Sequence, residues 1–382
     1  MLGIASGLSP FGLTIAVPLL AMMATRFNTD MGVTQFTLSA YLLGLAVAQP
    51  FNGFLCDRFG RRRVMLTGFA VFSLASIAVA FAGSMEFLIL FRFLQAAGVS
   101  VGTVVSRAVV RDTRDARGSA EALSYIAAIT GFAPIIAPVL GGWLASEGGH
   151  TAVFLSTAMF GTVIWILMYF RLDETLDPRF TSANWSDWVR NYKTLLGSRD
   201  FLAYSLIFGF VQGSFFAFLA VGAAVFASDF GIDERGFGII WGLLAITYVA
   251  GAVSGGRLTG KLGSTKVINI AVVLNLISGW AMTLMVVWFG VNLAGFLASM
   301  AFLMAAAGTI SPGALAGAVN AHPKMAGTAG GLSSAIGIVV GGLFTVLAGF
   351  MYHGDFLSAS WLITAATTLT AGSWLLRRFH SS

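Results

Sequence analysis

The chain has 382 residues, of which 57% are hydrophobic and only 10% are charged. Soluble globular domains carry about 25% charged residues, so this composition excludes an ordinary soluble domain and indicates a protein built largely within a bilayer. The net charge of +6 comes from basic residues that lie mainly in the loops expected on one side of the membrane. No basic domain stands outside the apolar stretches, so binding to nucleic acid is not expected.

Twelve apolar stretches are long enough to cross a bilayer as helices, since a crossing needs about 20 apolar residues. We expect them near 2–26, 34–56, 64–84, 87–108, 119–146, 150–171, 200–227, 236–257, 265–288, 291–317, 325–349 and 355–377. The sequence therefore predicts an all-α membrane protein with twelve transmembrane helices. We expect no cleavable signal peptide, because the first stretch is too long and a second follows at once.

Basic residues lie almost entirely in alternate connections between these stretches. If the N-terminus is cytoplasmic, all but three of the 22 Lys and Arg residues fall in inner loops or the C-terminal tail. The exceptions are Arg26 and Arg235 in outer loops and Arg92 within a stretch. Because positively charged loops stay in the cytoplasm, this pattern predicts that both termini are cytoplasmic.

The longest polar interval, residues 172–199, is expected to link two bundles of six helices. These bundles are residues 1–171 and 200–382. Within the linker, NWSDWVRNYKTLL (184–196) has the apolar spacing of an amphipathic helix lying along the inner membrane surface. We expect it to be a connector rather than a regulatory element.

A local repeat relates the two halves. GFLCDRFGRRRV (53–64) aligns with GRLTGKLGSTKV (256–267) at a constant offset of 203 residues, which pairs Gly60 with Gly263. Both copies fall between the second and third predicted helices of their half. A six-helix unit used twice in parallel is typical of carriers with a site between the halves at mid-membrane.

Several segments resemble the major facilitator superfamily. The first repeat copy resembles its signature between helices two and three, LFRFLQAAG (90–98) its helix-four signature, and GFAPIIAPVLGGWL (131–144) the helix-five signature of drug antiporters. SRAVVRD (106–112) and HPKMAGTAGGL (322–332) are similar to the bicyclomycin-resistance type of twelve-helix drug:proton antiporters. The resemblance implies two pseudo-symmetric six-helix bundles that work by alternating access.

In that family the loop signature has a gating role. The resemblance assigns this role to Gly53, Asp57, Arg58, Gly60, Arg61 and Arg62. Their charges would form a network that holds the inner side shut. The alternative is a topology anchor whose surface ion pairs contribute little.

Arg92 is the only basic residue well inside a predicted helix, about 9 Å beyond Glu86 at the outer start of that helix. A charge at this depth is costly and usually faces a wet cavity or a partner. The resemblance implies that Arg92, with Gln95, handles protons and substrate. The alternative is that Arg92 reaches outward to pair with Glu86 or another outer acid.

The helix-five signature is expected to bend its helix and to let a neighbouring helix pack closely. Its residues are Gly131, Pro134, Pro138, Gly141 and Gly142. Polar side chains elsewhere are candidates for lining a mildly polar cavity, and these are Thr14, Gln49, Asn52, Tyr125, Gln212, Tyr248 and Asn275. Each alone is more readily explained by a helix–helix hydrogen bond. No metal or cofactor is expected, because the single cysteine, Cys56, has no metal-ligand neighbours.

Proton coupling is where the sequence departs from the family pattern. Thr14 stands where these antiporters often carry Asp, and none of the 16 acidic residues lies near the middle of a predicted helix. Coupling would then run through Asp57, Asp112 or Glu121, or through Arg92 with Glu86. The missing acid argues against a strongly cationic substrate.

From these features we expect a monomeric transporter of the bacterial inner membrane that exports small amphiphilic compounds against protons. The alternative is a facilitator or importer of a small metabolite, carboxylate or vitamin-like, without strict proton coupling. A membrane-embedded enzyme is disfavoured, because the acids on the inner helix ends are isolated and form no catalytic constellation.

Overall fold

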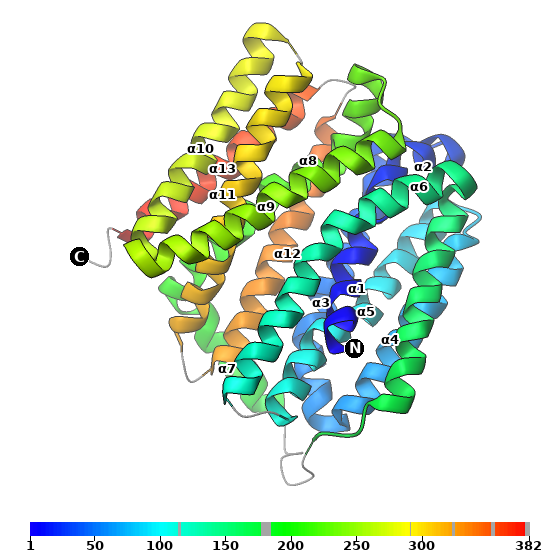
Figure 1. Ribbon diagram of the computed structural model, residues 1–382, viewed down its shortest axis with the longest axis vertical. Coiled ribbons are helices and arrows are strands. Elements are labelled where there is room, and N and C mark those ends of the chain that lie inside the picture. Colours follow the sequence, from blue (N-terminus) through cyan, green and yellow to red (C-terminus); the bar gives the residue numbers. More distant parts are fainter. Residues whose placement is uncertain (114–115, 177–184, 291, 323–324, 353–355, 379–382) are drawn as a thin grey trace. The chain divides into compact units, whose positions relative to one another are not determined.

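A computed structural model describes residues 1–113, 116–176, 185–290, 292–322, 325–352 and 356–378 of the chain. Within these ranges every regular element is a helix (Figure 1). Ten helical segments of the described chain are long and apolar enough to cross a bilayer. The predicted all-α membrane fold is therefore confirmed.

The first predicted crossing is divided into three elements. They are α1 (Leu2–Thr14), the 3-10 turn η1 (Val17–Leu19) and α2 (Leu20–Phe27). Pro18 lies in the first turn of η1. Since proline has no backbone N–H to donate, the α-helical ladder is interrupted there and resumes one turn later.

Four longer helices complete the N-terminal part, namely α3 (Met31–Phe59), α4 (Arg61–Ala80), α5 (Met85–Thr113) and α6 (Ala116–Arg171). α6 contains the fifth and sixth predicted crossings in one element. They are separated at Gly148 and Gly149, whose backbone angles are not helical and whose φ reaches 64° at Gly149. A glycine adopts this left-handed conformation without the clash that a Cβ would cause, so the chain reverses here.

The C-terminal part begins with the short helix α7. The elements are α7 (Trp185–Leu196), α8 (Arg199–Phe230), α9 (Glu234–Leu262), α10 (Ser264–Phe289), α11 (Leu293–Asn320), α12 (Ala326–Met351) and α13 (Phe356–Arg378). α13 coincides with the last predicted crossing but is not among the ten apolar segments, because Ser and Thr residues along it lower its mean hydropathy. With α6 counted as two crossings, all twelve predicted crossings have a helix.

The chain forms two compact units, residues 1–29 with 36–190 and residues 30–35 with 191–382. In the first, α4 packs on α5 and α6, and α1 packs on the same two helices. In the second, α8 is the central helix and contacts α11, α12 and α13. The domain boundaries expected from the sequence stay a prediction.

α7 is the described part of the predicted amphipathic segment. Its Leu195 is buried in a cluster with Phe201, Ala318 and Leu332, and Tyr192 packs against the same cluster. Burial raises the pKa of the Tyr192 phenol to about 12, because the charged phenolate would lose its hydration there.

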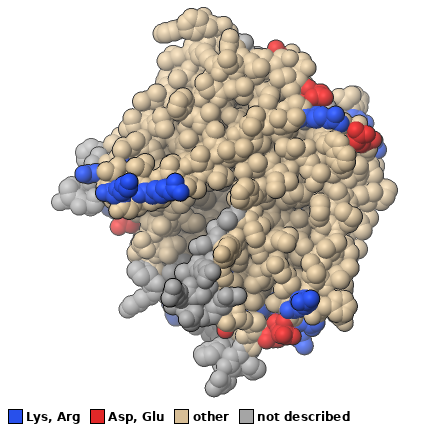
Figure 2. Space-filling model, viewed as in Figure 1, with Lys and Arg blue, Asp and Glu red and all other residues tan. Residues whose placement is uncertain are grey.

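Charged side chains occupy little of the molecular surface. Figure 2 shows that, on the face in view, Lys, Arg, Asp and Glu gather in a few small groups while most of the surface carries none of them. Large apolar side chains are exposed instead, among them Leu74, Phe170 and Phe289. Such a surface is stable in hydrocarbon and is what a membrane-embedded protein requires.

Candidate functional site

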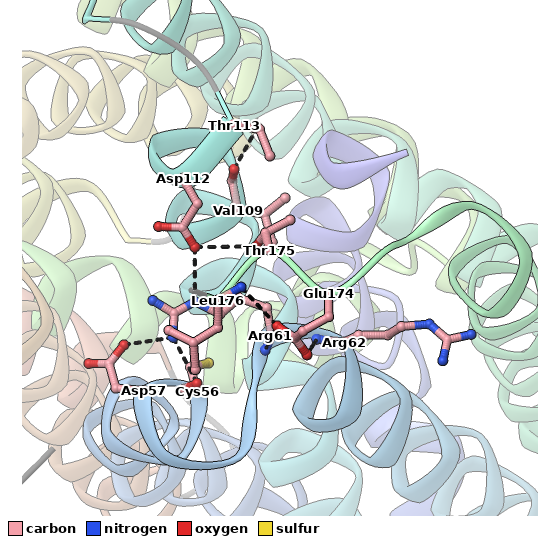
Figure 3. A network of polar contacts seen from close by, with 10 residues as sticks. All are labelled: Cys56, Asp57, Arg61, Arg62, Val109, Asp112, Thr113, Glu174, Thr175 and Leu176. Atoms are coloured by element: carbon pink, nitrogen blue, oxygen red, sulfur yellow. Dashed lines mark hydrogen bonds and ion pairs between the residues drawn. The ribbon is translucent and has the colours of Figure 1, made fainter. Parts of the chain in front are cut away.

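The loop signature forms a compact charge network around the Arg61 side chain (Figure 3). The guanidinium lies 2.9 Å from a carboxylate oxygen of Asp57 and 3.0 Å from one of Asp112, and it donates to the Cys56 carbonyl at 2.7 Å. Arg61 is 7% exposed, so its charge is largely removed from water. We call Asp57, Arg61 and Asp112 the Arg61 network. It joins the end of α3, the start of α4 and the end of α5.

Glu174, which follows α6, caps the N-terminus of α4 (Figure 3). Its carboxylate accepts hydrogen bonds from the backbone N–H groups of Arg61 at 2.8 Å and Arg62 at 3.2 Å. The Arg62 guanidinium donates to the carbonyls of Leu172 and Tyr169, both at 2.8 Å. A carboxylate at a helix N-terminus satisfies free N–H groups and complements the helix dipole. Glu174 is a site residue that the sequence did not indicate.

Gly60 separates α3 from α4 and has a backbone conformation reserved for glycine, with φ 93° and ψ 153°. Gly263, its partner in the sequence repeat, has nearly the same conformation between α9 and α10, with φ 82° and ψ 149°. The repeat thus preserves the geometry of the turn, although the charges around it differ, since Gly260 replaces Asp57 in the second copy.

Replacing Gly60 with Ala is expected to lower the free energy of unfolding by about 1–3 kcal/mol, because the positive φ is strained for any side chain. The added Cβ would also lie 2.3 Å from a Glu174 carboxylate oxygen, which would displace the cap of α4. Thermal unfolding of the purified protein measures the effect. Gly53→Ala is the matched control, since its Cβ would meet nothing within 4 Å. Equal behaviour of the two variants would contradict the prediction.

Arg92, which lies on α5, is fully buried within the first unit. Its Nη1 donates to the Gly12 carbonyl at 2.9 Å and to Oε1 of Gln95 at 2.6 Å, and Gln95 donates in turn to Ser76 at 2.7 Å. The guanidinium carbon lies 4.2 Å from the ring centre of Tyr41. We call Gly12, Tyr41, Ser76, Arg92 and Gln95 the Arg92 network.

The alternative that Arg92 reaches outward to Glu86 is wrong. The guanidinium bonds to neutral groups only, and no ion pair of Arg92 is found in the described part of the chain. Its Nη2 atom is buried without a hydrogen-bond partner there. The side chain also faces no open cavity in this conformation, because the helices around it enclose it completely.

The helix-five signature lies in the first half of α6. Pro134 and Pro138 do not interrupt the helix, since the only non-helical angles in α6 are at Gly148 and Gly149. Gly141 and Gly142 are buried. A Cβ at Gly141 would lie 2.2 Å from the Ile15 carbonyl oxygen, whereas one at Gly131 would meet nothing within 4 Å. The close packing expected of this run therefore occurs at Gly141, against the end of α1.

Gly141→Ala is expected to destabilise the protein by about 1–3 kcal/mol, because the extra methyl would push α6 away from the backbone of α1. The matched variant Gly131→Ala should be neutral or stabilising by up to about 1 kcal/mol, since alanine favours the helix and space is free. Thermal unfolding of both variants in detergent tests this. A destabilised Gly131→Ala variant would show that the run acts through helix flexibility instead.

Three of the predicted cavity-lining residues are buried between helices. Thr14 donates to the Pro10 carbonyl at 2.9 Å, and Asn52 donates to Ser100 at 2.7 Å. Asn275 is fully buried in α10, and its amide has no partner in the part of the chain that is described. The Asn52 contact joins α3 to α5 and agrees with the helix–helix alternative, whereas the Thr14 contact lies within α1.

The other four predicted lining residues are more open. Gln49, Gln212 and Tyr248 are half-buried. Tyr125 is 65% exposed. Whether they face a common cavity stays a prediction.

An aromatic cluster in the second unit was not indicated by the sequence. Trp241 of α9 is buried and stacks on Phe218 of α8, with ring centres 5.4 Å apart, while Phe215 lies 5.3 Å away. The Trp241 indole N–H has no acceptor among the described residues. Because 33 Phe residues are spread over the chain, no pattern in the sequence distinguishes the ones in this cluster from the others.

Comparisons with known proteins agree with the fold and with the signatures. The Major Facilitator Superfamily model matches residues 2–345. The chain is 30% identical over 363 residues to Multidrug resistance protein D of Escherichia coli, covering 95% of this chain and 91% of that protein. It is 26% identical over 351 residues to a bicyclomycin resistance protein homolog of Haemophilus influenzae, covering 92% and 88%.

A solved structure has the same fold at much lower identity. The D-xylose-proton symporter matches with a TM-score of 0.78 at 16% identity, over 98% of this chain and 96% of that one. The family model covers most of the chain and includes both networks. The chain therefore belongs to the major facilitator superfamily and is an integral membrane transporter rather than an enzyme.

Proposed function

We propose that this transporter exports small amphiphilic compounds across the bacterial inner membrane in exchange for protons, by alternating access. The observation that carries the proposal is the similarity, over 92% and 95% of the chain, to two relatives whose names refer to drug resistance. Both termini would be cytoplasmic and the monomer would be the working unit, as the distribution of basic loops and the two-bundle fold suggest.

The charges within the helices favour neutral, zwitterionic or anionic compounds over cations. Arg92 is buried without a carboxylate in the described chain, and every acid of the sequence lies near a helix end or in a loop. A cationic substrate would therefore find no counter-charge at mid-membrane and would meet the field of Arg92. A neutral compound would be held by apolar and aromatic contacts, which the Phe-rich helices supply.

For proton exchange we propose the Arg61 network. Two carboxylates, Asp57 and Asp112, share one guanidinium. Protonation of either carboxylate would leave Arg61 paired with the other, so a proton can enter without exposing an unpaired buried cation. The same network would hold the inner end of its bundle closed. Protonation of a carboxylate in the network would therefore also affect whether that end opens. The side chain of Glu121, the other inner candidate, lies outside the described residues.

The test is transport in proteoliposomes with an imposed pH gradient and an enclosed pH-sensitive dye. Matched neutral, zwitterionic, anionic and cationic amphiphiles are added one at a time. We expect the non-cationic compounds to cause proton movement in the wild type and not in Asp112→Asn. Arg257→Gln, which alters an exposed residue of α9, is the control for surface charge. Cation-driven proton flux alone would contradict the substrate assignment.

A facilitator without proton coupling is the second candidate. The lack of an acid in the middle of any predicted crossing favours it, because proton-coupled carriers usually place a carboxylate there. The same proteoliposomes separate the two functions. Substrate flux that proceeds equally with and without the pH gradient, and with no dye response, would establish the facilitator and end the proposal of antiport.

A further inference from the structure

The first unit has a surface groove that neither network uses. Helices α3, α4 and α5 line it, and its volume is about 480 Å³. Its walls are mostly apolar, with Leu55, Phe59, Val64, Val71 and Val101 among the lining side chains. Sites for small molecules commonly have volumes of about 300–1,000 Å³, so the groove is large enough for part of an amphiphile.

A close contact between two helices explains why the groove exists. A Cβ at Gly98 of α5 would lie 2.6 Å from the Gly68 carbonyl oxygen of α4. The two backbones therefore touch where both residues line the groove. Because Gly68 and Gly98 have no side chains, the surface is low between the two helices, and the larger side chains on either side form the walls of the groove.

One end of the groove carries positive charge that no described acid pairs with. Arg63 lines it and is exposed, and Arg58 lies 5.6 Å from the ring centre of Phe59, another lining residue. Neither arginine has an ion pair with a described residue. The neighbouring acids are engaged elsewhere, since Asp57 and Asp112 pair with Arg61.

We propose that this groove binds an anionic phospholipid. The lipid phosphate contacts the Arg63 guanidinium, and one acyl chain lies along the apolar walls towards Val71 and Val101. The arginine at one end of the groove complements a negatively charged headgroup, and the apolar walls beyond it complement an acyl chain. A soluble anion would need only the arginines, and the long apolar part of the groove would then have no occupant. The bilayer that surrounds these helices supplies such lipids at high local concentration.

Native mass spectrometry of the full-length protein in detergent tests the proposal. The protein is titrated with phosphatidylglycerol and, separately, with phosphatidylcholine of the same acyl chains. We expect one phosphatidylglycerol to remain bound at energies that remove phosphatidylcholine. Arg63→Gln should weaken this binding about fivefold, which corresponds to one basic side chain near an anionic lipid. The control is Arg257→Gln, which removes the same charge from an exposed position outside the groove.

Two further arms test the acyl chain. Val71→Trp, which fills the apolar part, should also weaken phosphatidylglycerol binding while leaving thermal unfolding near that of the wild type. Glycerol 1-phosphate, which has a phosphate but no acyl chain, should not compete. Retention of phosphatidylglycerol by both groove variants at the wild-type level would overturn the proposal. Competition by glycerol 1-phosphate would overturn it as well, because the site would then bind phosphate alone.

Discussion

Replacement of Arg92 with Met is expected to reduce transport at least tenfold while changing thermal stability little. The guanidinium is fully buried, and its Nη2 atom has no hydrogen-bond partner in the described chain. A charge held away from water without a carboxylate is costly, so its removal offsets the loss of the hydrogen bonds that Arg92 donates to Gly12 and Gln95. A costly charge that is nevertheless present inside a transmembrane bundle indicates function. Flux in proteoliposomes and thermal unfolding in detergent measure the two effects.

Comparing Arg92→Met with a second variant, Arg92→Lys, separates the effect of charge from that of side-chain shape at this position. Arg92→Lys keeps the positive charge but has a single ammonium, which cannot reach Gly12 and Gln95 while also covering the Tyr41 ring. It should therefore transport poorly as well. Arg257→Met, at an exposed position of α9, is the control. If Arg92→Met unfolded far below the wild type, and the loss of flux followed the loss of folded protein, Arg92 would be a structural residue.

Much of the fold was predictable because each crossing is marked locally. Runs of apolar residues indicated the helices, and the Gly148–Gly149 pair fell in the predicted gap between two of them. The α13 helix was also expected, although its Ser and Thr residues lower its hydropathy. The short turn η1 was missed, because a single Pro18 in a long apolar run is compatible with a continuous helix as well as with an interrupted one.

The two networks show where sequence reasoning reaches its limit. Asp57 and Arg61 are four residues apart and share a signature, so their pairing was foreseeable. Glu174 is 113 residues from Arg61, and only the packing of α6 brings it to the start of α4. The position of Arg92 well inside a helix was indicated by its apolar stretch, but its complete burial was not, since a wet cavity was expected around it. Its hydrogen bond to Gly12 was not foreseen, because every residue has a backbone carbonyl and nothing in the sequence marks which one will accept.

Removal of the Arg61 side chain is the second change with a large expected effect. In Arg61→Gln, among the described residues, the partly buried Asp112 carboxylate keeps only its hydrogen bond from Thr175, and the Cys56 carbonyl keeps only the one from the Gly60 N–H. We expect a loss of about 1–3 kcal/mol in the free energy of unfolding, since a partly buried hydrogen bond between charged groups contributes about this much. Asp57→Asn should have less effect, about 0–1 kcal/mol, because the Asp57 side chain is 52% exposed and its ion pair is screened by water. Denaturation of the purified variants compares them.

The double variant Arg61→Gln with Asp112→Asn then separates stability from coupling. It removes both charges of the Arg61–Asp112 pair and leaves only the half-exposed Asp57 carboxylate without its partner, so the unfolding free energy should recover part of the loss, with an interaction energy of about 0.5–3 kcal/mol. Substrate-driven proton movement should not recover, because the shared proton site is gone. A double variant that regains proton movement together with stability would show that the network only holds three helices together. One that regains stability alone would place the exchangeable proton on the carboxylates of Asp57 and Asp112 around Arg61.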